Sequence, residues 1–126
     1  MDGEYLNFGD FIAKNRQQRN ITLRGMARKM NISSTYLNEV EKDRRNPFDF
    51  EKLIKISDIL MLSEEERNIM MDLAGEKRAE VAPDIPEYIK DNCYLTTALR
   101  TARDLGVAEE EWMEIVELLK KRRLTV

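Results

Sequence analysis

The chain has 126 residues, 42% of them hydrophobic, which accommodates one compact domain or a small domain with an appendage and excludes a large multidomain enzyme. It has no histidine and one cysteine, so an internal disulfide, the usual zinc sites and histidine-based acid–base catalysis are excluded. The net charge of -3 conceals an asymmetry, because Lys14 to Arg45 holds 9 basic and 3 acidic residues, and a weakly acidic protein can therefore present a basic face.

The sequence gives expectations for the location of the protein and for its cofactors. The N-terminal sequence MDGEYLNFGD is acidic and lacks the basic-then-apolar order of a secretion signal, and the longest apolar run, ILML, has four residues. We therefore expect a cytoplasmic protein with no membrane span, no metal site and no cofactor. Cys93 is expected to be a small core residue, because free cysteine is among the most buried residue types.

The spacing of apolar residues predicts an all-α protein. Gly and Pro occur five and three times, and apolar residues recur at three and four positions with almost no alternation, so we expect about eight helices. The first five are expected at about Phe8–Arg19, Leu23–Met30, Ser33–Lys42 and Asp49–Leu60, and from Ser63 onward. Thr22, Ser33 and Ser63 are expected as N-caps, with Glu66 completing a capping box and Asn31 as the left-handed residue that ends the second helix.

The same spacing predicts which side of each helix faces the core. The expected inward residues are Phe8, Phe11 and Ile12; Met26, Ala27 and Met30; Leu37, Val40 and Glu41; Leu53, Ile56 and Leu60; and Ile69, Met70 and Leu73.

A change of composition predicts two parts. The segment Gly75–Pro86, GEKRAEVAPDIP, is expected to be a linker between an N-terminal domain at 1–74 and a helical extension at 87–126. The extension is expected to hold three helices, near Glu87–Asp91, Leu95–Leu105 and Ala108–Arg123. The last carries a strongly amphipathic stripe formed by Trp112, Ile115, Val116 and Leu119.

The segment Thr22–Lys42, TLRGMARKMNISSTYLNEVEK, fits a helix-turn-helix. That motif needs a small residue where its helices touch, a tight turn between them, and apolar residues that hold the second helix against the first. Ala27, the turn at Asn31 to Ser33, and Leu37 with Val40 meet these needs in the right order.

The segment Phe8–Ala74 resembles the phage-repressor (Cro/CI, XRE-type) family over its whole five-helix DNA-binding domain. ISSTYLNEVEKDRRNP, from Ile32 to Pro47, matches that family's recognition helix and following turn. The sequence PDIPEYIKDN and the helices after it resemble the tail of short regulators found in bacterial mobile elements. The resemblance implies a five-helix DNA-binding domain followed by about three helices.

The sequence departs from the family pattern at three positions. Leu23 stands where a Gln commonly makes a phosphate contact, Asn31 replaces the usual turn Gly, and Asp43 replaces the Gly after the recognition helix. None of these changes is expected to break the scaffold.

The resemblance implies roles for the recognition helix. Ser34, Thr35 and Asn38 are expected to contact base edges, where hydroxyls serve donors or acceptors and Asn pairs with adenine. Glu39 occupies a position that the family uses for base contact, and a solvated side chain is the alternative. Glu41 faces inward, and the family pairs it with Arg16 in an ion pair between the first and third helices.

Phosphate contacts are expected around this helix, from basic side chains and from helix N-termini. Tyr36 is expected to lean on the second helix with its hydroxyl near a phosphate, and pure packing is the alternative. The expected residues are Thr22, Arg24, Arg28, Ser33, Tyr36, Lys42, Arg44 and Arg45.

These expectations favour a sequence-specific DNA-binding transcriptional regulator, a repressor that binds a pseudo-palindromic operator as a homodimer. Twofold symmetry places two recognition helices about one DNA turn (~34 Å) apart. The dimer or partner surface is expected on the stripe of Ile69 and Leu73 or on the stripe of the last helix, which can instead fold back as core. The alternative is an antitoxin or adaptor whose extension binds a toxin or a protease; an enzyme is not expected.

Overall fold

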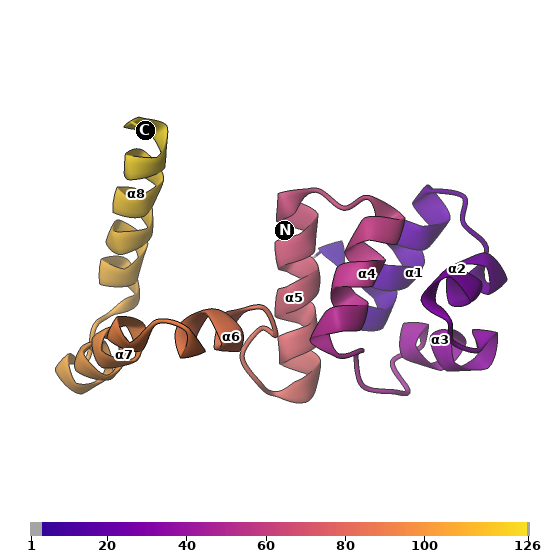
Figure 1. Ribbon diagram of the computed structural model, residues 1–126, viewed down its shortest axis with the longest axis horizontal. Helices are drawn as coiled ribbons and strands as arrows, with labels where there is room; N and C mark the ends of the chain where they lie inside the picture. Colours follow the sequence, from indigo (N-terminus) through magenta and orange to yellow (C-terminus); the bar gives the residue numbers. More distant parts are fainter. Residues whose placement is uncertain (1–3, 126) are drawn as a thin grey trace. The chain divides into compact units, whose positions relative to one another are not determined.

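The computed structural model describes residues 4–125, with side chains described through residue 122 (Figure 1). This range is all-helical, as predicted, and divides into two compact units, residues 4–86 and 87–125. Its helices are α1 (Phe8–Gln18), α2 (Leu23–Met30), α3 (Ser34–Glu41), α4 (Phe50–Leu60), α5 (Glu64–Arg78), α6 (Ile85–Lys90), α7 (Cys93–Leu105) and α8 (Glu109–Thr125). Within the described residues, no helix is both long enough and apolar enough to span a bilayer.

Polar side chains start each of the first five helices by accepting a hydrogen bond from a free backbone N–H of the first turn. These N-caps are Asn7, Thr22, Ser33, Asp49 and Ser63. Thr22, Ser33 and Ser63 are the predicted caps. At α5 the Glu66 carboxylate also accepts from the Ser63 backbone N–H at 2.9 Å, which completes the predicted capping box.

Left-handed residues end several helices where the chain must turn away. Asn31 has φ 58° and ends α2 as predicted, because Asn tolerates this conformation better than most residues. Met61 ends α4 at φ 53° and Ala79 ends α5 at φ 56°.

The predicted linker at Gly75–Pro86 is wrong in its first part, because α5 continues through Arg78. Glu76, Lys77 and Arg78 are good helix formers, and bases suit the C-terminal end of a helix. Gly75 lies inside this helix. A Cβ at Gly75 would lie 2.9 Å from the backbone of residues 80 and 82, so the glycine allows the following segment to fold back against α5.

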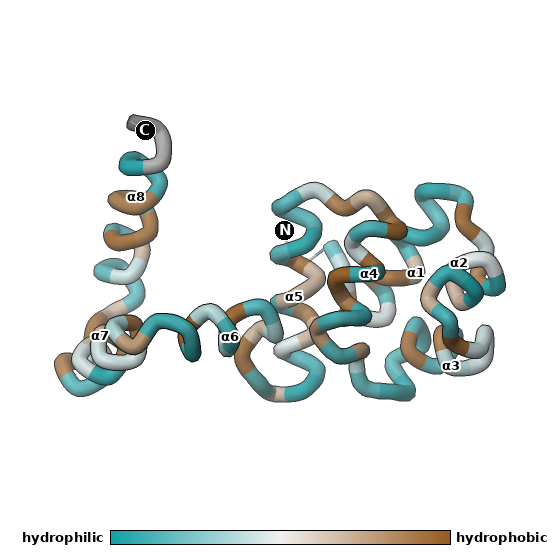
Figure 2. Tube along the Cα trace, in the orientation of Figure 1, coloured by the Kyte–Doolittle hydropathy of each residue, from teal (hydrophilic) through white to brown (hydrophobic). Residues whose placement is uncertain are grey.

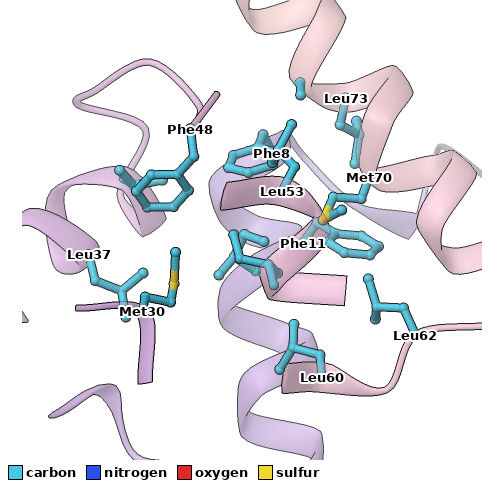
Figure 3. Close-up of a cluster of buried hydrophobic side chains, with 14 of the residues drawn as sticks. Phe8, Phe11, Met30, Leu37, Phe48, Leu53, Leu60, Leu62, Met70 and Leu73 are labelled. Atoms are coloured by element: carbon cyan, nitrogen blue, oxygen red, sulfur yellow. The ribbon is translucent and has the colours of Figure 1, made fainter. Parts of the chain in front are cut away.

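The core of the N-terminal unit lies between α1 to α5 (Figure 3), and the predicted inward faces are confirmed. Phe11, Ile12, Leu53 and Ile56 are fully buried. The hypothesis that Ile69 and Leu73 form a dimer or partner surface is wrong, because both are buried in this core.

A close approach between α1 and α3 depends on Gly9. Its Cα faces the end of α3 so closely that a Cβ would lie 2.3 Å from the Val40 carbonyl oxygen. Any larger residue would push α3 away from α1. The position of α3 is therefore set by backbone contact as well as by side chains.

Within the described residues, the C-terminal unit has no comparable core. None of the residues of α6 and α7 is buried, and Figure 2 shows apolar segments along α7 and α8. α7 ends at Leu105, as predicted, and Gly106 follows it with φ 67°. The short segment up to Ala108 leads into α8. Cys93 is exposed at the first position of α7, so the prediction of a buried cysteine is wrong. The rule that cysteine is buried presupposes a core, and this helix has none in the single chain.

Because Glu66 caps α5 with its carboxylate, its contribution to the stability of the fold depends on pH. Its backbone hydrogen bond from Ser63 lowers the pKa of the Glu66 carboxyl despite partial burial, with Arg19 adding a smaller effect. A lowered pKa stabilises the fold above the unfolded pKa of about 4.3, and this stabilisation is lost as the pH falls through the folded value.

We predict that Glu66→Gln lowers the free energy of unfolding by less than about 1 kcal/mol at pH 7. The difference from wild type should shrink towards zero in acid, measured by urea unfolding at several pH values. Glu65→Gln, in the same helical turn, is the control with little effect. A loss in Glu66→Gln that does not change with pH would contradict this role.

Candidate nucleic-acid interface

Helices α2 and α3 begin with hydroxyl caps that remain able to donate. Thr22 Oγ1 accepts from the Gly25 N–H at 2.9 Å, and Ser33 Oγ accepts from the Tyr36 N–H at 3.0 Å. Because each hydroxyl accepts in this bond, its own proton is free for another acceptor. Both caps are exposed, so each helix start presents an O–H together with free backbone N–H groups, an arrangement suited to a phosphate.

Arg16 and Glu41 join α1 to α3 in the ion pair that the family resemblance implies. Arg16 Nε lies 2.8 Å from Glu41 Oε2, and Nη2 lies 3.0 Å from Oε1, so the pair is bidentate. The third donor, Nη1, binds the Ile21 carbonyl at 2.9 Å. The two side chains are only 11% and 7% exposed, so Glu41 is scaffold and does not face a ligand.

The outward face of α3 carries the three predicted base-contacting residues. Leu37 and Val40 are buried against the core, which turns the opposite side of the helix to solvent. Thr35 is exposed, and Ser34 and Asn38 are partly exposed. The structure therefore brings these short polar side chains together on one accessible face, and their contact with bases remains a prediction.

The loop after α3 is held from two sides. Asp43 adopts the left-handed conformation at φ 62°, and the Arg44 N–H donates to the Glu39 carbonyl at 2.9 Å. From α5, Lys77 Nζ lies 3.0 Å from Asp43 Oδ1, and Arg78 binds the Pro47 carbonyl oxygen. The acid that replaces the family's glycine therefore still turns the chain, and it also provides an anchor to α5.

Each acid on α3 and its following loop has a basic partner. Glu41 pairs with Arg16, Asp43 with Lys77, and Glu39 with Arg45, whose Nε lies 2.6 Å from Glu39 Oε2. Exposed cations of this region, in contrast, form no ion pair within the described residues, among them Arg24, Arg28, Lys42 and Arg44. Pairing therefore neutralises the acids and leaves a cationic surface around the face of α3.

Tyr36 packs as well as facing solvent. Its ring meets Phe48 edge to face with centroids 5.4 Å apart, and the Arg45 guanidinium carbon lies 5.3 Å from its centroid. The packing alternative is thus present in the structure, and a phosphate contact by the hydroxyl remains a prediction.

The sequence interpretation missed Lys77 and Arg78, which it placed in a linker. Their contacts with Asp43 and Pro47 span 34 and 31 positions along the chain. The sequence signal was the continuation of good helix formers beyond Gly75, which would have placed both bases on the last turn of α5.

Two adjacent capped helices, a tight turn and a cationic outer surface define a helix-turn-helix DNA-binding domain. Residues 12–66 match the family model described as Helix-turn-helix. This match supports a DNA-binding transcriptional regulator, and it agrees with the resemblance of the sequence to the phage-repressor (Cro/CI, XRE-type) family.

Two further comparisons add little. A solved chain from a structure titled "SinR protein/SinI protein complex" is 18% identical to this chain, covers 92% of it and 97% of itself, and has a TM-score of 0.46. No curated protein matches the sequence.

The buried ion pair should dominate the stability of the helix-turn-helix. We predict that Arg16→Met lowers the free energy of unfolding by about 3–5 kcal/mol, because it leaves the Glu41 charge buried without a partner. The double variant Arg16→Met/Glu41→Leu should cost less than the sum of the single variants. Chemical denaturation measures all three.

Lys52→Met is the matched control, because it breaks an exposed ion pair. In that pair Lys52 Nζ lies 3.7 Å from Asp49 Oδ2. It should cost less than about 1 kcal/mol. An Arg16→Met loss no larger than that of Lys52→Met would show that the pair between α1 and α3 is dispensable.

Proposed function

We propose that the protein is a sequence-specific repressor that places α3 in the major groove of double-stranded DNA. The observation that carries this proposal is the surface around α3, where three acids are paired and Arg24, Arg28, Lys42 and Arg44 are exposed. Cations at the rim neutralise phosphates and position the helix, while short polar side chains in the centre meet base edges.

In this proposal Ser34, Thr35 and Asn38 contact bases. The caps of α2 and α3 hold phosphates with their hydroxyls and backbone N–H groups. The protein acts in the cytoplasm, where its DNA lies.

The protein is proposed to bind a pseudo-palindromic operator as a homodimer through α8. Trp112, Ile115, Val116 and Leu119 are 38%, 40%, 46% and 62% exposed, so the other described residues of the C-terminal unit leave this stripe uncovered. A 17-residue helix with an uncovered apolar stripe is marginal in water unless a partner buries that stripe.

The charges along α8 favour a second copy as that partner. Glu109, Glu110 and Glu111 form the first turn, and Lys120 and Lys121 lie near the other end. Twofold symmetry allows two α8 helices to pair antiparallel, and in that arrangement the acidic end of each lies beside the basic end of the other. Parallel pairing would place like charges together.

A second candidate function is that of an antitoxin or adaptor whose DNA-binding domain regulates its own operon. The observation that favours it is the apolar surface outside the α8 stripe, because Tyr94 on α7 and Leu105 at its end are 82% and 77% exposed. A foreign protein such as a toxin or a protease could bury them. Co-purification of a second protein with the full chain would distinguish this candidate from the homodimer.

Selection of tight-binding duplexes from a random pool tests the DNA-binding proposal. We predict a preferred sequence, and the affinity for it should fall as the salt concentration rises. Arg44→Ala should reduce the slope of log affinity against log salt concentration by about the amount of one phosphate contact. Asn38→Ala should cost about 1–3 kcal/mol on the preferred site and relax its specificity. Binding with no sequence preference would contradict a sequence-specific repressor.

The dimer proposal predicts that Ile115→Glu/Leu119→Glu converts a dimer into a monomer, because two charges would have to be buried in the α8 interface. Analytical ultracentrifugation reports the mass, and affinity for a full operator should fall to about that for a half-site. Thr101→Glu, an exposed change on α7, is the control and should remain dimeric. A wild-type chain that is monomeric at micromolar concentration and binds full and half operators equally would exclude this dimer.

A further inference from the structure

Arg45, in the loop after α3, is held by two contacts with side chains of α3. Its Nε donates to Glu39 Oε2 at 2.6 Å, and its guanidinium carbon lies 5.3 Å from the centre of the Tyr36 ring. Tyr36 in turn meets Phe48, which is 2% exposed and belongs to the core. A chain of contacts thus connects the guanidinium to the rigid interior of the domain.

These contacts leave one edge of the guanidinium available. A guanidinium has five N–H donors, and the Nε–H is the one that binds Glu39. Within the described residues, the terminal nitrogens of Arg45 make no hydrogen bond, and the side chain is 57% exposed. The two terminal nitrogens therefore form a fixed, open pair of donors.

The Glu39 carboxylate decides which ligand suits this pair. A phosphate approaching Arg45 would meet a negative charge already bound to the same guanidinium, and like charges repel. A base edge is uncharged, so it does not meet that repulsion. Guanine presents two acceptors in the major groove, O6 and N7, and an arginine fork binds both.

We propose that Arg45 reads a guanine in the operator, with Glu39 as the residue that positions it. This inference rests on the proposed function, since it needs a preferred DNA site. It replaces two expectations from the sequence, namely that Arg45 contacts a phosphate and that Glu39 contacts a base directly. The two residues lie six positions apart, on α3 and on its following loop, so they add one recognised base beyond the outward face of α3.

Arg44 provides the matched comparison at the next position. It is exposed, and its side chain makes no ion pair or hydrogen bond within the described residues. An exposed cation without a protein partner suits a phosphate. The two adjacent arginines should therefore behave differently when each is removed.

The test is a double-mutant cycle on binding to the selected operator, to operators with each G·C pair replaced in turn, and to random DNA. The variants of the full chain are Arg45→Ala, Arg45→Lys, Glu39→Gln, Arg45→Ala/Glu39→Gln and Arg44→Ala. Thermal unfolding of each checks that the fold is intact. Discrimination is the ratio of the affinities for the selected and the replaced sequences.

Arg45→Ala and Arg45→Lys should lose roughly tenfold or more of the discrimination at one G·C pair, the order expected for a bidentate contact. Glu39→Gln should lower the discrimination at the same pair while raising affinity for random DNA, because it removes a negative charge. In the Arg45→Ala background, Glu39→Gln should cause no further loss of discrimination. Arg44→Ala should weaken binding to all DNA sequences equally.

Two results would overturn the inference. If Glu39→Gln still reduces discrimination when Arg45 is absent, Glu39 reads a base itself. If Arg45→Ala weakens all sequences equally, as expected for Arg44→Ala, Arg45 contacts phosphate. Both results leave the proposed function standing, whereas failure of the wild-type chain to select any sequence would remove the proposed function first.

Discussion

The ion pair between Arg16 and Glu41 fixes the part of the structure on which DNA recognition depends. It is bidentate and almost wholly buried, and it ties the last turn of α3 to α1. Gly9 reinforces it by letting the two helices meet at backbone distance. With the inner side of α3 held at both points, its outer side is presented as a rigid surface, which is what recognition by a helix requires.

The acidic composition and the basic surface are reconciled by pairing. Glu39, Glu41 and Asp43 lie on or beside α3, and each has a basic partner from a different part of the domain. The three basic partners have different structural effects. Arg16 completes the scaffold, Lys77 anchors the loop to α5, and Arg45 keeps an open donor edge that the proposal assigns to a base. Net charge alone therefore says little about what this surface binds.

The sequence predicted most of the N-terminal unit because its signals are local. Caps such as Thr22 and Ser33, and the periodic apolar residues, depend on neighbours within four positions. The contact of Lys77 with Asp43 was not predictable, since it depends on how α5 and the loop after α3 meet in space. The contact of Arg45 with Glu39 was not predictable either, since it depends on the path of that loop back towards α3. The prediction that Cys93 is buried was wrong because the rule behind it assumes a core, and the described residues of the extension form none in one chain.

The central claim is that α3 and the loop after it form the DNA-contacting surface. Amide chemical-shift perturbation of the full chain by its selected operator tests this most directly. The account predicts that the largest shifts fall on the starts of α2 and α3 and on residues 42–46, while amides of the buried face of α1 change little. Large shifts confined to α7 and α8, with α3 unchanged, would contradict it.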